Sequence, residues 1–160
     1  MDEKIIKAKG AYAAAIAALD GMKWTYDRDD ENLAINTGAK GDDFPIRIII
    51  RSLSDSETLS IICPLGFDIS EKARVETAIA VTVANYGMIR GSFDYDFMDG
   101  DIRFRISAPF TDTELSPSLI NLLILIAVQT VDEYNDKFFM ISKGMLSIQD
   151  FIKQERGEND

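Results

Sequence analysis

An Asp-Gly dipeptide between two alternating segments constrains the fold of this chain more than any other feature. Asp99-Gly100 separates two stretches in which apolar and polar residues alternate, Ser92–Met98 and Asp101–Ile106. A two-residue type I′ turn needs positive φ at both central positions, and Asp-Gly meets that need. The sequence therefore predicts a β-hairpin that runs from Ser92 to Ile106.

Placing Asp99-Gly100 at the centre of the turn also predicts which residues of the two strands face each other. Asp94 then faces Arg105 and Asp96 faces Arg103, while the other side pairs Phe97 with Ile102, Tyr95 with Phe104 and Phe93 with Ile106. Cross-strand pairs of these kinds contribute about 0.2–1 kcal/mol each. A calcium loop counted from Asp94 fails, because Met98 and Arg105 occupy ligand positions. We interpret these aspartates as structural.

Helical and strand patterns along the rest of the chain complete an α+β order. Apolar residues at three- and four-residue spacing predict helices, and alternation with period two predicts strands. Helices are expected at 2–19, 69–86, 116–142 and 147–155, and strands at 22–27, 33–37, 44–53 and 57–63 besides the hairpin. The order α-β-β-β-β-α-β-β-α-α predicts an antiparallel sheet with helices on one face. A single domain over residues 1–156 is expected, with a frayed acidic tail at 157–160.

The residue composition excludes most catalytic and metal chemistry. The chain has no histidine and one cysteine, Cys63, so Ser-His-Asp, Cys-His and the usual zinc and iron ligand sets are excluded. The loop Gly38–Gly41 lacks the Gly-Lys-Ser/Thr ending of a phosphate loop. We predict no catalytic residue, cofactor or metal. A carboxylate-based hydrolase stays as a hypothesis ranked below the two that are given later in this section.

The net charge narrows the classes of partner. At −10, the chain is expected to bind neither nucleic acid nor an anionic membrane surface, since both need Lys and Arg. The most apolar run, Leu119–Val128, is shorter than the ~20 residues that span a bilayer. Residues 1–4 do not resemble a signal peptide, so a cytoplasmic protein is expected.

A second strand pair predicts a candidate protein-binding surface on the outer side of the sheet. With Asp55-Ser56 in the turn, Ile49 faces Ile62 on the side that points away from the helices. Arg47 and Arg51 flank Ile49 on the same side. Apolar groups rimmed by guanidinium groups suit a protein partner. The alternative is that the long loop or the C-terminal helix covers these residues.

The long helix at 116–142 carries apolar residues on every side of its first turns, among them Leu119, Leu122 and Ile126. Such a helix must be covered on more than one side. Two interpretations remain open. A second copy of the chain covers these residues in a homodimer, or they are buried beneath the terminal helix.

The acidic cluster Asp27, Asp29, Asp30 and Glu31 also has two interpretations. Carboxylate oxygens of this kind hold Ca²⁺ or Mg²⁺. Polar residues in a turn between two strands explain the cluster more simply. Its metal interpretation belongs to our alternative hypothesis, a small-molecule or divalent-metal-responsive binding domain that uses the acidic loops or a pocket between sheet and helices.

The stretch from Asn85 to Arg105, with a helix ending in Asn, an acidic strand, an Asp-Gly turn and an Arg-Phe-Arg strand, resembles the YbjN family. Trp24, near the start of the first expected strand, also resembles the pattern of this family. The family is described as bacterial sensory transduction regulators, and the resemblance implies a type III secretion chaperone-like fold. It implies no catalytic residues. We expect a cytoplasmic, non-enzymatic protein-interaction module with a regulatory or chaperone-like role, acting on another protein.

Overall fold

The computed structural model describes residues 2–157 and confirms the predicted order of elements. The helices are α1 (Glu3–Gly21), α2 (Arg74–Tyr86), α3 (Pro117–Ser142) and α4 (Ile148–Arg156), and a short 3₁₀ helix (Glu71–Ala73) precedes α2. The strands are β1 (Asp27–Asp29), β2 (Ala34–Lys40), β3 (Pro45–Leu53), β4 (Thr58–Pro64), β5 (Ser92–Asp96) and β6 (Asp101–Pro109).

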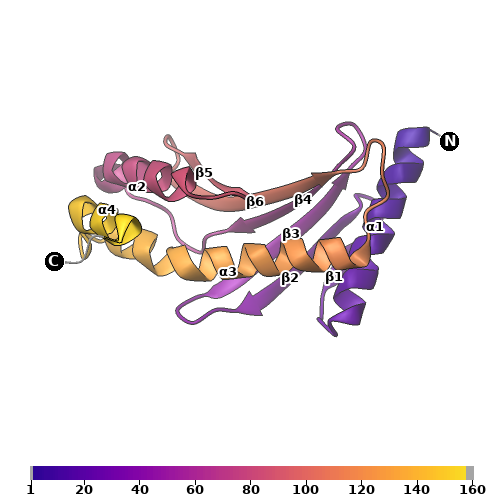
Figure 1. The fold of residues 1–160 in the computed structure, drawn as a ribbon, viewed down its shortest axis with the longest axis horizontal. Coiled ribbons are helices and arrows are strands. Elements are labelled where there is room, and N and C mark those ends of the chain that lie inside the picture. Colours follow the sequence, from indigo (N-terminus) through magenta and orange to yellow (C-terminus); the bar gives the residue numbers. More distant parts are fainter. Residues whose placement is uncertain (1, 158–160) are drawn as a thin grey trace.

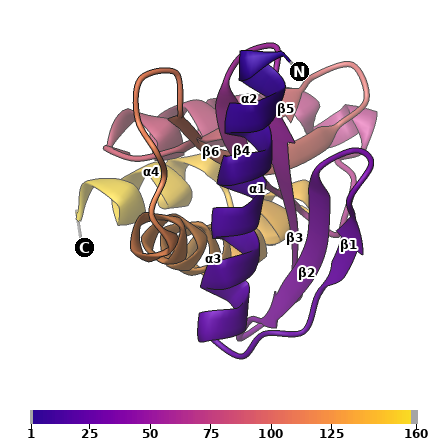
Figure 2. The same cartoon turned by 90° about the vertical axis from the view of Figure 1, so that its right-hand side faces the viewer.

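The six strands form one antiparallel sheet in the order β1-β2-β3-β4-β6-β5 (Figure 1). Alternate residues of β3 and β6 are buried, so the helices cover one face of the sheet. Figure 2 shows α1 and α3 on the same side of β1, β2 and β3. The predicted fold class, an antiparallel sheet with helices on one face, is confirmed.

The core lies between the sheet and α3. Ile48, Ile50 and Ile61 of the sheet are fully buried, as are Ile120 and Ile124 of α3. Toward the β5 edge the core becomes aromatic, with ring centroids 5.0–6.2 Å apart in the group Phe93, Phe104, Tyr134, Phe138 and Phe151. Phe151 belongs to α4, so this cluster attaches the last helix to the rest of the molecule.

The predicted first strand, 22–27, is wrong in its bounds. Helix α1 continues to Gly21, and the chain then turns, with the Lys23 N–H donating to Asp20 and the Trp24 N–H donating to Leu19. Lys23 itself has a positive φ of 59°. The turn therefore uses the residues that we had assigned to the strand, and β1 begins only at Asp27.

The hairpin exists, but its predicted register is wrong by two residues. The loop has four residues, 97–100, and Asp94 faces Arg103 while Tyr95 faces Ile102. The side chain of Asp96 explains the longer loop, because its Oδ1 accepts hydrogen bonds from the N–H groups of Met98 and Asp99. A shift of two residues keeps every side chain on its predicted face.

Asn85, at the end of α2, forms two hydrogen bonds with the outer edge of β5. Its Nδ2 donates to the carbonyl of Phe93 at 2.9 Å, and its Oδ1 accepts from the Phe93 N–H at 2.8 Å. An edge strand with free backbone groups is a template for pairing with another chain. Asn85 thus satisfies both outward backbone groups of Phe93 in the way that a neighbouring strand does.

The C-terminal prediction is only partly within the described residues. Helix α4 ends at Arg156, and Gly157 caps it in a left-handed conformation. Residues 158–160, which make up the rest of the expected frayed tail, lie outside the described residues.

Candidate functional site

The outer face of the sheet brings the four predicted protein-binding residues together. Ile49 of β3 faces Ile62 of β4, as predicted, and both side chains are half-buried. Arg47 and Arg51 lie two residues to either side of Ile49 on β3, and both are exposed. The four residues therefore form a continuous surface, and the alternation of β3 points it away from the helices.

Two further arginines border this surface, and sequence reasoning did not include them in it. Strand β6 pairs with β4 on its other side, which places Arg105 opposite Ile62 and Arg103 opposite Pro64. Their side chains are 50% and 46% exposed. The adjacency of β4 and β6 is a property of the sheet order, and no residue pattern in either strand indicates it. We call Arg47, Ile49, Arg51, Ile62, Arg103 and Arg105 the arginine face.

One carboxylate, that of Asp94, binds two arginines of the arginine face. Asp94 Oδ2 lies 2.9 Å from Arg105 Nε and 3.4 Å from Arg103 Nε, and its Oδ1 accepts from Arg105 Nη2 at 3.1 Å. The prediction that Asp96 pairs with Arg103 is wrong, because the two-residue shift places Asp96 opposite Asp101.

The guanidinium groups of Arg47 and Arg51 have no hydrogen-bond or ion-pair partner among residues 2–157. The face therefore has four guanidinium groups and a single carboxylate bound to two of them. Guanidinium groups are weakly hydrated and carry planar arrays of donors, so they bind carboxylates well at protein interfaces.

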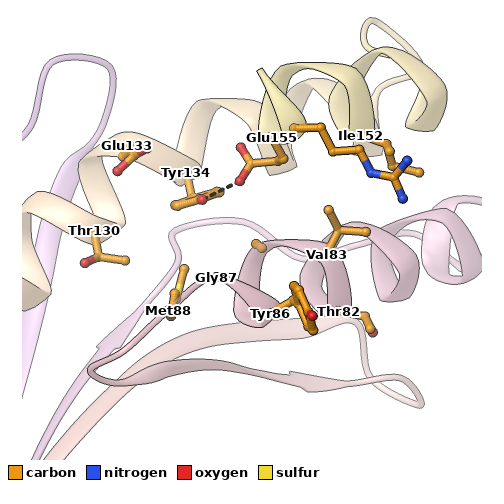
Figure 3. Close-up of a pocket in the computed structure, with 12 residues that line it drawn as sticks. Thr82, Val83, Tyr86, Gly87, Met88, Thr130, Glu133, Tyr134, Ile152 and Glu155 are labelled. Atoms are coloured by element: carbon orange, nitrogen blue, oxygen red, sulfur yellow. Dashed lines mark hydrogen bonds between the residues drawn. The ribbon is translucent and has the colours of Figure 1, made fainter. Parts of the chain in front are cut away.

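A second candidate site is a cleft of about 740 Å³ between α2 and α4, with α3 as its third wall (Figure 3). Its walls are mainly apolar, with Val83 and Met88 on the α2 side and Ile152 on the α4 side. Tyr86, at the mouth, is 96% exposed. The sequence-based alternative, a pocket between the sheet and the helices, did not predict this position, because the lining residues come from three helices and the loop after α2.

Polar groups at one side of the cleft bind each other. The hydroxyl of Tyr134 donates to Glu155 Oε2 at 2.6 Å, which Figure 3 shows as a dashed line. Lys137 Nζ lies 3.6 Å from Glu155 Oε1 and 5.0 Å from the centre of the Tyr134 ring. Burial raises the pKa of Tyr134, and the hydrogen bond to Glu155 raises it further. The phenol therefore stays protonated, and the network joins α3 to α4.

The predicted dimer-interface residues lie on the first half of α3. Leu119 is 38% exposed and Leu122 is 46% exposed, while Ile126 is half-buried against the core. Leu125, which we did not predict, is 45% exposed on the same helix. Burial beneath the terminal helix is therefore the wrong interpretation for the two leucines. Their cover by a second copy of the chain stays a prediction.

The acidic cluster near β1 makes hydrogen bonds of its own. Asp30 Oδ1 accepts from the Tyr12 hydroxyl at 2.7 Å and from Arg28, and these two bonds lower the pKa of Asp30 in that order. Asp29 accepts from the side chain and backbone of Asn32, which lowers its pKa. Across residues 2–157, no set of three cysteine, aspartate and glutamate side chains converges in a way that could hold a metal ion.

Cys63 is fully buried on β4, and burial raises the pKa of its thiol to about 12. The thiolate is therefore scarce at neutral pH, and the Cys63 thiol is a poor nucleophile. None of the helices within residues 2–157 has the length and apolarity that crossing a membrane requires.

A family model and several solved structures match the chain. The model of the YbjN family, "Putative bacterial sensory transduction regulator", matches residues 16–140, from α1 to near the end of α3. The crystal structure of "YbjN, a putative transcription regulator from E. coli" is 11% identical, with a TM-score of 0.54 over 76% of this chain and 86% of that chain.

Two protein complexes also contain a chain of this fold. A chain of the ExsC–ExsE complex is 10% identical, with a TM-score of 0.55 over 85% of this chain and 96% of its own length. A chain of the HopA1–SchA chaperone–effector complex is 14% identical, with a TM-score of 0.51 over 80% of this chain and 96% of its own. No curated protein matches the sequence. The expected type III secretion chaperone-like fold is confirmed.

Proposed function

Since this chain belongs to the YbjN family, we propose that it is a non-enzymatic protein-interaction module with a regulatory or chaperone-like role. The partner binds on the arginine face. The observation that carries the proposal is the half-buried pair Ile49–Ile62 beside Arg47 and Arg51, whose guanidinium groups have no partner within residues 2–157. Apolar groups at the centre with arginines around them have the composition of a protein interface.

The structural neighbours add support of a second kind. Two of them come from complexes of two proteins, one of which is a chaperone–effector complex. Proteins that share a fold can differ in function. The neighbours therefore support a protein as the class of partner and do not identify that protein. The absence of histidine and the high pKa of Cys63 support a non-enzymatic role.

Replacing Ile49 and Ile62 together by aspartate will reduce capture of the native partner at least about tenfold, because the change removes the apolar centre of an interface. Tagged wild-type and variant proteins are compared by quantitative affinity capture from the native cell. The Ile49→Thr/Ile62→Thr variant keeps β-branched side chains and must lose binding in the same direction. Val75→Asp, at a 61% exposed position on α2, is the matched control.

Equal capture by the wild type, the Ile49/Ile62 variants and Val75→Asp contradicts the proposal, as does a wild type that captures nothing above background. Thermal unfolding of each variant separates loss of binding from loss of fold.

The cleft between α2 and α4 supports a second candidate function, the binding of a small molecule. A concave, mainly apolar site of about 740 Å³ has the size of many ligand pockets. A ligand present at ~100 times its Kd stabilises the folded protein by about 2.7 kcal/mol. A thermal-shift screen with metabolites tests this candidate, and Ile152→Glu in the cleft wall must abolish any shift. A screen without a shift removes the candidate.

A further inference from the structure

The arginine face carries positive charge on an acidic molecule. The chain has eight arginines and a net charge of −10, and four of the eight arginines lie on this face. The outward positions of β3 and β4, which form its centre, carry no aspartate or glutamate. Its charge is therefore opposite to that of the whole molecule, and it favours a partner segment with negative charge.

The face already binds one carboxylate. Asp94 reaches it from β5, and both Arg103 and Arg105 contact its side chain at 2.9–3.4 Å. Arg47 and Arg51 present the same guanidinium groups beyond the reach of Asp94 and have no partner within residues 2–157. The contacts of Asp94 thus indicate the kind of group that fits the two free arginines.

The spacing of the free arginines defines the segment further. Arg47 and Arg51 are four residues apart on β3, a separation of about 13 Å along an extended strand. Ile49 lies midway between them, and Ile62 lies beside it on the next strand. A complementary segment therefore needs a large apolar side chain between two carboxylates.

We propose that the partner binds through an acidic segment whose two carboxylates engage Arg47 and Arg51 and whose apolar side chain packs on Ile49 and Ile62. This inference rests on the proposed function and names the chemistry of its partner. Nucleic acid is the other polyanion that arginines bind. We favour the acidic protein segment because the apolar pair Ile49–Ile62 at the centre of the face matches an apolar side chain, whereas arginines that bind a nucleic-acid backbone contact phosphates alone.

A displayed library of random peptides tests the inference, with the wild-type protein as bait. The selected peptides are expected to be enriched in pairs of acidic residues that flank a large apolar residue. In fluorescence anisotropy with the best peptide, Arg47→Gln/Arg51→Gln is expected to weaken binding about 10- to 100-fold, because two charge-assisted contacts are lost. Raising the salt concentration must weaken wild-type binding more than variant binding.

Two further variants separate the possible outcomes. Lys9→Gln/Lys72→Gln removes the same charge from exposed positions on α1 and the 3₁₀ helix, and it must bind like the wild type. Loss of binding in Ile49→Thr/Ile62→Thr but not in the arginine variant overturns the acidic segment and leaves the proposed function standing. No loss in either variant, or no selected peptide at all, overturns both. Tight wild-type binding to a single-stranded oligonucleotide that the arginine variant loses overturns the inference in favour of nucleic acid.

Discussion

Gly100→Ala will destabilise the protein by about 2–5 kcal/mol, because the substitution combines a left-handed backbone with a steric clash. Gly100 has a φ of +77°, and a Cβ atom there would lie 2.1 Å from the carbonyl oxygen of Ile69. The Ile69 N–H also donates to the Gly100 carbonyl at 2.8 Å, which fixes the hairpin loop against the chain that leads into α2. Urea unfolding at neutral pH measures the loss of stability.

Gly144→Ala is the matched control for this prediction. Gly144 has nearly the same φ, +70°, but no atom lies within 4 Å of the Cβ position. Only the backbone cost of about 1–2 kcal/mol then applies. If both variants lose the same free energy of unfolding, the close approach of Gly100 to Ile69 does not contribute, and the described packing of the loop is wrong.

Phe138→Ala will cost about 3–5 kcal/mol, a large part of the 5–15 kcal/mol that stabilises a typical domain. The Phe138 side chain is fully buried. Its ring centroid lies 5.0 Å from that of Phe93, 5.8 Å from that of Tyr134 and 6.2 Å from that of Phe151. The deletion leaves a cavity where β5, α3 and α4 meet. The midpoint of chemical denaturation is the measurement.

Phe97→Ala is the control for the size of this effect. Phe97 lies in the hairpin loop, is 48% exposed, and has one ring neighbour, Tyr95, at 6.4 Å. We expect a loss below about 1 kcal/mol, as for most exposed positions. If Phe97→Ala and Phe138→Ala lose the same free energy of unfolding, the described burial of Phe138 in the aromatic core is wrong.

The outer sheet face could be predicted from sequence because its determinants are local. The turn at Asp55-Ser56 fixes the pairing of Ile49 with Ile62, and the alternation of β3 fixes which side chains share a face. The hairpin register was missed because the Asp-Gly signal specifies a two-residue turn, whereas the Asp96 side chain stabilises a four-residue loop. The prediction of which side chains share a face of the hairpin stayed correct, because side chains alternate with a period of two and the register error was two residues.

The rest of the candidate site depends on contacts between elements that are distant in sequence. Arg103 and Arg105 join the arginine face only because β6 inserts between β4 and β5. The cleft exists because α4 packs beside α2, where Phe151 enters the aromatic core. Periodicity places residues on the faces of their own helix or strand, and it carries no information on which elements become neighbours.

Site-specific photo-cross-linking in the native cell tests the central claim, that the arginine face binds another protein, most directly. A photoreactive amino acid replaces Ile62 in one variant and the exposed Val75 of α2 in another. Our account predicts a covalent adduct with a second protein from position 62 that disappears when Arg47 and Arg51 are changed to glutamine. Adducts from position 75 with none from position 62 would contradict it.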